Sequence, residues 1–466
     1  MFCVSGINTA PPEAGPGVVN EAHQIEIRDR IVKTIYREAE AIAARVVRQT
    51  GPHRDWEHKV DDILTSRLLG FPVMFLLLGL VFWITLVGAS YPSQALANAL
   101  FWGEERLSEV FVCLDAPPWL HGLVVTGVYR TAAWVVSVML PPMAIFFPIF
   151  SLLEDLGYLP RVAFNLDRLF KMAGAHGKQA LTMSMGFGCN AAGVMACRII
   201  ESPRERLIAI LTNNFVPCNG RFPTLIALAS IFVGPAAAPG FSSLAASFTV
   251  VGLILAGILI TLLTSWLLSR TILKGVPTTF TLELPPLRLP QVGRVLVRSV
   301  LDRTLFVLAR AVTVAAPAGA VVWILANISF EGQSLLARGA GLLEPFGRAL
   351  GLDGFILLAF ILGLPANEIV LPILLMGYLS AGTMVEVDSL IVLQNILVHG
   401  HGWTWLTALC TMLFSLLHFP CGTTLFTIQR ETKSIRWAVW AAVIPLAVAG
   451  LVCFAVAQTV QALGLV

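Results

Sequence analysis

Polar residues that could bind a metal ion interrupt apolar segments at two places in the first half of the chain. Cys189-Asn190 follows Gly186-Phe187-Gly188, and Cys218-Asn219-Gly220 follows Pro217. Glycine and proline are poor helix formers, so a helix is predicted to break at each place. Thiolate ligands suit transition metals, whereas alkali and alkaline-earth ions prefer all-oxygen shells. The two breaks therefore predict a transition-metal site.

The second half of the chain repeats this order of residues. Ala366-Asn367-Glu368 corresponds to Cys189-Asn190, and Pro420-Cys421 corresponds to Pro217-Cys218. Interrupted hydrophobic segments at corresponding places in two halves indicate the binding site of a transporter. An ionisable residue inside an apolar run, such as Glu368, is functional by default. The candidate metal ligands are Cys189, Asn190, Cys218, Asn219, Asn367, Glu368, His418 and Cys421.

His418 is the least decided of these candidates. It lies three residues before Cys421, on the same face of a helix. An interior histidine bonded to its neighbours is an equally good interpretation. The other cysteines, among them Cys113 and Cys410, are interpreted as packing residues, because free cysteine is a common buried small hydrophobe. Zinc-finger spacing is absent, which excludes a closed structural zinc site.

Composition places these residues in a membrane. The 466 residues are 56% hydrophobic and 13% charged, with a mean hydropathy of +0.79, whereas soluble domains carry about a quarter charged residues. We predict an all-α, polytopic helical membrane protein with two repeated bundles, each holding a broken or re-entrant helix. The predicted spans are 68–88, 122–150, 207–233, 243–268, 303–327, 354–378, 383–398, 403–429 and 436–460. Because 383–398 is short and polar, we expect about eight or nine crossings.

Loop charges predict the orientation. The segments 154–178, 198–206, 270–303 and 430–436 are rich in lysine and arginine and belong in the cytoplasm, whereas the loop at 89–121 is acidic and belongs outside. This orientation places the N-terminus in the cytoplasm. The predicted domains are a disordered segment 1–19, a cytoplasmic helical spacer 20–67, a first membrane half 68–275, a cytoplasmic linker 276–300 and a second membrane half 301–466.

Several motifs resemble the membrane part of FeoB-type ferrous iron transporters. Met185-Gly-Phe-Gly-Cys-Asn190, Pro203-Arg-Glu-Arg-Leu207 and Pro217-Cys218 resemble the first Gate region of that family, and Ala366-Asn-Glu-Ile-Val370 with Phe419-Pro-Cys421 resembles the second. The resemblance covers roughly residues 25–455. It implies that Fe²⁺ is the transported substrate, with no permanently bound cofactor, and that the protein is a multi-pass protein of the bacterial inner membrane. It also implies that Cys189, Cys218 and Cys421 line the pathway.

One part of the family pattern is missing from these 466 residues. Family members join the membrane part to an N-terminal GTP-binding domain, but no G-x-x-x-x-G-K-[ST] loop occurs here. The nearest match has Met172 in place of the first glycine and Gln179 in place of the Ser or Thr. We therefore expect a transporter and not an enzyme. Either a separate GTPase or small regulatory protein docks on residues 20–66, or transport proceeds without nucleotide.

Other functions stay open at this stage. A Mn²⁺ permease is the nearest alternative, although three thiols favour iron. A nucleoside-like organic solute carrier comes next, because similar Gate regions occur in such carriers, but thiols add nothing to sugar binding. A non-transporting membrane scaffold is a third alternative. No basic patch with interleaved aromatic residues suggests a nucleic-acid partner. The expected partner is the lipid bilayer, and the sequence leaves a homo-oligomer open.

Overall fold

The computed structural model describes residues 21–46, 55–66, 69–234, 241–274, 291–330, 332–385, 387 and 389–464. The predicted disordered segment 1–19 and most of the predicted linker 276–300 lie outside these residues. The described chain falls into two units. Helix α1 (Glu21–Val46) is the described part of the first unit, and Ile31, Ile35 and Ile42 are exposed on it.

The second unit contains all other described helices. Its first helix, α2 (Asp55–Leu64), packs against α3 (Gly70–Cys113) and α6 (Tyr158–Met172). Arg161 Nε of α6 donates to Asp61 Oδ1 at 2.6 Å, and Asn165 Nδ2 donates to the carbonyl of Leu64 at 2.7 Å. These polar contacts fix α2 at the start of the first membrane helix.

The fold is all-helical, as predicted, apart from a hairpin of two-residue strands, β1 (Ser329–Phe330) and β2 (Gln333–Ser334). Six helical segments of the described chain are long and apolar enough to cross a membrane. They are α3, the run α4 (Pro118–His121), η1 (Gly122–Tyr129) and α5 (Arg130–Asp155), then α11 (Ser242–Arg270), α13 (Phe306–Asn327), the pair α18 (Trp405–Leu417) and α19 (Gly422–Thr432), and α20 (Ile435–Ala462). A seventh is the pair α14 (Leu335–Ala349) and α15 (Gly354–Leu362), bent by 111°.

This count of six or seven differs from the eight or nine crossings predicted, because apolar runs do not form continuous helices at the breaks. The predicted span 207–233 is divided between α9 (Pro203–Thr212), η3 (Asn213–Phe215) and α10 (Phe222–Phe232). The predicted span 383–398 forms only α17 (Leu390–Gln394) and the π-helical η6 (Asn395–Gly400), too short to cross. The predicted acidic loop at 89–121 is mostly helical, since α3 continues through Pro92.

The backbone repeats at the first pair of breaks. Helices α7 (Gln179–Gly188) and α8 (Asn190–Ala196) meet at Cys189, which is extended at φ −157° and ψ 126°. Helix α15 ends at Leu362, and a short turn leads to Ala366, which is extended at φ −152° and ψ 127° and precedes η5 (Asn367–Ile369). In both places one extended residue comes directly before a new helical segment, which begins at Asn190 in the first half and at Asn367 in the second. This agreement of backbone angles follows the sequence repeat.

The second pair of breaks repeats as well. The α9–α10 segment opens between residues 216 and 221, and the α18–α19 segment opens between residues 418 and 421. The helices that follow, α10 and α19, are each 11 residues long. The remaining described elements are η2 (Cys197–Ile199), α12 (Val292–Arg298), η4 (Ser299–Leu305) and α16 (Val370–Tyr378).

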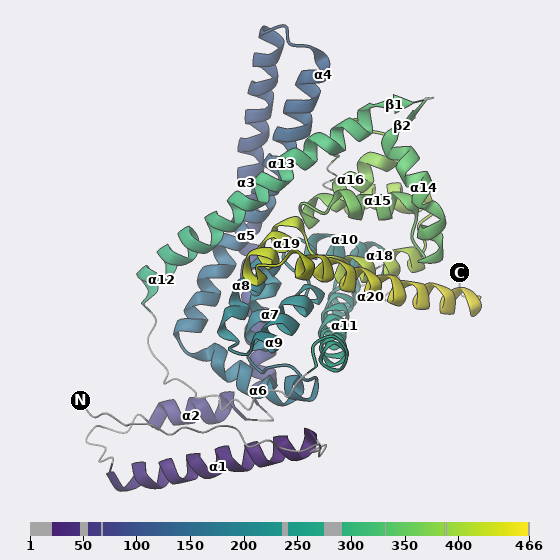
Figure 1. The fold of residues 1–466 in the computed structure, drawn as a ribbon. Helices are drawn as coiled ribbons and strands as arrows, with labels where there is room; N and C mark the ends of the chain where they lie inside the picture. The colour runs from purple at the N-terminus through teal and green to yellow at the C-terminus, as the bar shows by residue number, and fades with distance from the viewer. Residues whose placement is uncertain are drawn as a thin grey trace. The chain divides into compact units, whose positions relative to one another are not determined.

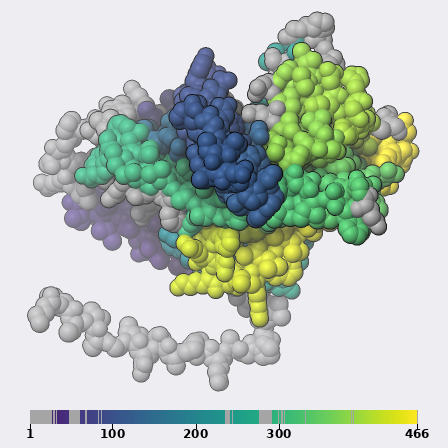
Figure 2. All heavy atoms as spheres, turned by 90° about the horizontal axis from the view of Figure 1, so that it is seen from above, coloured from purple at the N-terminus to yellow at the C-terminus, as the bar shows by residue number. Residues whose placement is uncertain are grey.

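The broken helices of both halves pack together inside the second unit. Helix α8 packs against α19, and α9 packs against both α11 and α20; Figure 1 shows α7, α8, α9 and α19 close together. Helix α5 packs against α3 on one side and α13 on the other. In Figure 2 the chain around residue 110, in blue, and around residue 390, in light green, form separate blocks on one face. The four breaks are thus enclosed by longer helices.

Candidate functional site

The four helix breaks line a single cavity, which we call the break cavity. Its walls come from the α7–α8, α9–α10, α15–η5 and α18–α19 breaks, with α5 and α13 beside them. Its lining residues are Met139, Met143, Gly188, Cys189, Asn190, Cys218, Asn219, Gly220, Ala311, Pro365, Ala366, Asn367, Glu368, Cys421 and Thr423. Seven of the eight predicted site residues are among them. Residues from both halves of the chain therefore meet at one place.

The thiols and the carboxylate differ in exposure to this cavity. Cys189 and Cys218 are buried, whereas Cys421 and Glu368 are half-buried. Asn367 Nδ2 donates to Cys218 Sγ at 3.7 Å, which joins the second half to the first. A Cβ at Gly220 would overlap the Glu368 carboxylate, so glycine at this position lets that side chain approach the α9–α10 break.

The free space in the break cavity is small. The centre of a water-sized sphere can move through about 20 Å³, and one water needs about 10–15 Å³ by this measure. The cavity in this conformation therefore accepts a species the size of a water molecule or an ion. A nucleoside would need the surrounding helices to separate.

A buried arginine connects the breaks of the two halves. Arg221 is 1% exposed. Its Nη1 donates to the carbonyls of Asn214 at 2.9 Å and Leu416 at 2.7 Å. Its Nη2 donates to Asn214 Oδ1 at 3.1 Å and to the carbonyls of His418 and Phe419, each at 3.2 Å. The guanidinium thus satisfies carbonyl groups that the α18–α19 break leaves without helical donors.

Asparagine side chains extend this network. Asn190 Nδ2 donates to Asn214 Oδ1 at 3.3 Å, and Asn213 Nδ2 donates to the Asn190 carbonyl at 3.3 Å. Asn214 Nδ2 donates to the carbonyl of His418 at 2.5 Å. Asn190 Oδ1, Asn213 Oδ1 and Arg221 Nε are buried without a hydrogen-bond partner among the described residues, so the network is only partly bonded, but the bonds that it makes join elements of both halves. The network fixes the α7–α8 break relative to the α18–α19 break.

His418 is the predicted site residue that does not line the break cavity. It is 1% exposed, and its Nδ1 lies 2.9 Å from the Ser415 carbonyl and 3.0 Å from the Phe414 carbonyl. Its ring packs on Phe360 with centroids 4.8 Å apart. These contacts match the interpretation of an interior histidine. Among the residues that the structure describes, no group of three or more His, Cys, Asp and Glu side chains is placed to hold a metal ion, so the metal role of all eight residues stays a prediction.

Comparisons with known proteins agree with this architecture. The family model "Gate: Nucleoside recognition" matches residues 136–232 and 308–434, and "Ferrous iron transport protein B C terminus" matches residues 250–302. The Fe(2+) transporter FeoB of Staphylococcus aureus (strain MSSA476) is 30% identical over 468 aligned residues, covering 95% of this chain and 67% of the relative. This chain belongs to the FeoB family. No solved structure matches it.

Other relatives of the FeoB family are similar over most of this chain. The Fe(2+) transporter FeoB of Methanocaldococcus jannaschii is 28% identical over 88% of the chain and 60% of the relative. A Porphyromonas gingivalis fusion of Fe(2+) transport protein A and FeoB is 27% identical over 85% of the chain and 50% of the relative. The chain thus spans from half to two thirds of the length of these FeoB proteins.

Two methionines of the FeoB-family site were not predicted from sequence. Met139 and Met143 of α5 line the break cavity. Their thioethers are soft and polarisable, and they could contact a transition metal. The sequence feature that could have indicated them is Pro141-Pro142 inside a long span. Prolines bend a helix and leave nearby carbonyl groups without a helical donor.

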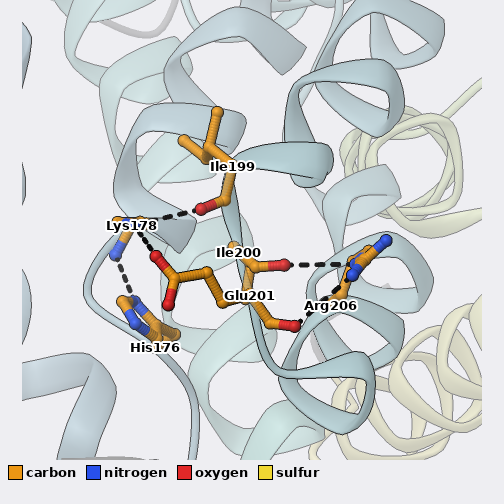
Figure 3. A network of polar contacts seen from close by, with 6 residues as sticks. All are labelled: His176, Lys178, Ile199, Ile200, Glu201 and Arg206. Atoms are coloured by element: carbon orange, nitrogen blue, oxygen red, sulfur yellow. Dashed lines mark hydrogen bonds and ion pairs between the residues drawn. The ribbon is translucent and has the colours of Figure 1, made fainter. Parts of the chain in front are cut away.

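A second polar network closes the α7–α8 hairpin of this FeoB-family chain, in the predicted cytoplasmic region (Figure 3). Lys178 Nζ donates to the Ile199 carbonyl at 3.1 Å and to Glu201 Oε1 at 3.4 Å. Arg206 Nε donates to the Ile200 carbonyl at 3.1 Å. The Lys178 backbone N–H donates to Nδ1 of His176 at 3.0 Å, and burial lowers the pKa of His176 below its ordinary value. The neutral imidazole is therefore the form that this loop favours.

Proposed function

We propose that this chain carries Fe²⁺ across a bacterial inner membrane into the cytoplasm, through the break cavity. The observation that carries the proposal is the meeting of three thiols and one carboxylate, from both halves of the chain, at one cavity between helix breaks. The names of the relatives, Fe(2+) transporters, support the choice of ion. The cavity size suits an ion and not an organic solute.

In this proposal the ion contacts the cavity residues a few at a time. A transported ion must bind strongly enough to enter and weakly enough to leave. Glu368 supplies the negative charge, and Cys189, Cys218 and Cys421 supply soft donors. The amide oxygens of Asn190, Asn219 and Asn367 replace water that the ion loses.

The order of crossings supports an inverted repeat. In this proposal the broken α9–α10 segment, which is not among the six or seven segments counted above, crosses together with α11 between α5 and α13, while α7 and α8 enter and return as a hairpin. Helix α13 then runs opposite to α5, and each later element is opposite to its equivalent in the first half. Because α17 and η6 are too short to cross, they do not add the crossing that would make α18–α19 run in the same direction as α9–α10. Repeats related in this way allow alternating access by rocking one bundle against the other.

Orientation and energy coupling belong to the same proposal. The lysine- and arginine-rich segments, including 198–206 and 430–436, place those ends of the broken helices in the cytoplasm. The N-terminus then lies in the cytoplasm, where residues 20–66 could receive a GTPase or a small regulatory protein.

The experiment is ⁵⁵Fe²⁺ uptake into proteoliposomes that contain this chain alone, with and without a FeoB GTPase and GTP. We expect uptake that needs intact thiols: changing Cys189, Cys218 and Cys421 together to Ser should lower it at least tenfold, whereas changing Cys113, Cys410 and Cys453 together should not. No uptake under any condition, or uptake of uridine that the triple Cys189/Cys218/Cys421 variant leaves unchanged, contradicts the proposal. Excess Mn²⁺ that competes as well as Fe²⁺ would favour a Mn²⁺ permease.

A further inference from the structure

The side chains of the second unit leave another cavity, distinct from the break cavity, which we call the apolar cavity. It lies between α3, α5, α6, α7 and α11, and its volume is about 270 Å³. By the same measure the break cavity has about 20 Å³. Among its lining residues only Tyr158 and Ser184 carry a polar side-chain group, and Ser184 Oγ already donates to the Ala180 carbonyl at 2.9 Å.

Such a cavity is unsuited to water and unfavourable without an occupant. A water needs two to four polar partners, and apolar cavities of this size stay dry. Side chains lining an unoccupied space lose their dispersion contacts on that side. A hydrocarbon occupant would restore these contacts.

The cavity is accessible from the bilayer. Three of its walls, α3, α5 and α11, belong to segments long and apolar enough to cross a membrane. Lining residues Phe75 and Leu255 are each 50% exposed, and Leu169 is 40% exposed, so the cavity continues onto the surface that these helices present to lipid. Its inner wall is α7, where Met183 and Phe187 are only 5% and 4% exposed.

We propose that the acyl chain of a membrane phospholipid enters sideways and fills the apolar cavity, packing against α7. Phe187 also lines a small space next to Gly188 and Asn219, residues of the break cavity. An acyl chain in the apolar cavity therefore packs against α7, the helix whose C-cap is Cys189, on the side that faces the apolar cavity. This inference does not depend on which ion the protein transports.

The test is photolabelling in liposomes containing phosphatidylethanolamine with a diazirine at mid-chain, followed by mass spectrometry of the peptides. We expect carbene insertion at Met183 and Phe187, reduced at least tenfold by excess unlabelled lipid. The variant A180F, which fills the cavity from α7, should lose this labelling about tenfold. Its matched control is L259F, which adds a ring on the lipid-facing side of α11, where Leu259 is 58% exposed; this control should keep the labelling of α7.

A smaller filling variant, S184L, keeps the test valid if A180F fails to fold. Labelling confined to outward residues of α3 and α11, with α7 unlabelled, would overturn the inference. The readout is labelling and not uptake, so its failure is distinct from failure of the proposed transport.

Discussion

At the residue scale, the cavity between the breaks depends on one carboxylate. Glu368 is the only acidic residue among the described residues that line it. Opposite charges about 4 Å apart interact by roughly 4 kcal/mol near a protein surface. A half-buried carboxylate is screened no more than one at the surface, so this attraction exceeds that of a neutral ligand.

We predict that Glu368→Gln lowers Fe²⁺ uptake at least tenfold, equivalent to ~1.4 kcal/mol. The amide keeps the shape and an acceptor oxygen, so the loss reports the charge. Proteoliposome uptake at saturating and limiting Fe²⁺ measures it. Glu109→Gln, at an exposed residue on α3, serves as the control and should leave uptake unchanged; equal uptake by both variants would contradict the prediction.

A second residue, Arg221, contributes to the stability of the folded protein by its hydrogen bonds to the α18–α19 break. We predict that Arg221→Met destabilises the protein by at least about 1–3 kcal/mol, because several buried carbonyl groups lose their donor. Arg221→Lys should lower the stability less, since an ammonium keeps the charge and can still donate hydrogen bonds. Some stability should still be lost, because an ammonium cannot reproduce the planar set of donors of a guanidinium. Thermal unfolding in detergent measures both. Arg348→Met, at an exposed arginine paired with Glu344, should change stability by less than about 1 kcal/mol.

At the scale of elements, the helix breaks need close approach between backbone and side chains. Gly220 touches the Glu368 carboxylate where a Cβ would stand, whereas a Cβ at Gly252 of α11 meets no atom within 4 Å. We predict that Gly220→Ala lowers stability by about 1–3 kcal/mol through overpacking and also lowers uptake. Gly252→Ala should be neutral or slightly stabilising. Unfolding midpoints and uptake of the two variants provide the comparison, and similar behaviour would refute it.

The α7–α8 hairpin should respond to pH through His176. Burial favours the neutral imidazole, and Nδ1 accepts from the Lys178 N–H. The unfolded chain then binds a proton at higher pH than the folded chain, so stability is full above about pH 6.5 and falls as the pH drops toward the lower folded pKa. We predict that His176→Asn, whose Oδ1 can accept the same bond, makes the unfolding midpoint less sensitive between pH 7.5 and 5.5. His399→Asn, at an exposed position, should keep the wild-type pH dependence.

At the scale of the whole molecule, an ion pair joins the two halves. Arg198 of η2 donates from Nε to Glu431 Oε2 at 2.7 Å and from Nη2 to Oε1 at 2.5 Å. Arg198 is 69% exposed, so the pair adds little to stability. The position of the pair matters because Arg198 follows the broken helices α7 and α8 of the first half, whereas Glu431 lies in the last turn of α19 in the second half. Rocking of the two bundles would separate them.

We predict that a bis(methanethiosulfonate) crosslinker joining the cysteines introduced by R198C and E431C stops Fe²⁺ uptake and that a reductant restores it. R198C alone, treated with the same reagent, should transport normally. Formation of the crosslink is checked by mass spectrometry. Full uptake with the crosslink formed would exclude relative motion of the two bundles at this place.

The sequence by itself determined the features that depend on local physical chemistry. Long apolar runs required helices in lipid, and Gly186-Phe187-Gly188 with Pro217 and Pro420 required those helices to break. The repeated order of residues even specified the matching backbone of Cys189 and Ala366. Seven of the eight residues that the sequence predicts for a metal site line the break cavity, because polar groups at membrane depth need a reason to be there.

Only the tertiary structure decided which of these groups meet. His418 and Cys421 share a local pattern, yet packing against Phe360 turns the histidine away from the break cavity. Met139, Met143 and the carbonyl partners of Arg221 come from elements far apart in the chain, and no local pattern reveals their contact. The number of crossings also needed the structure, because an apolar run has the same composition whether it forms one helix or two. Local propensity fixes where a helix ends, whereas long-range packing fixes what its end faces.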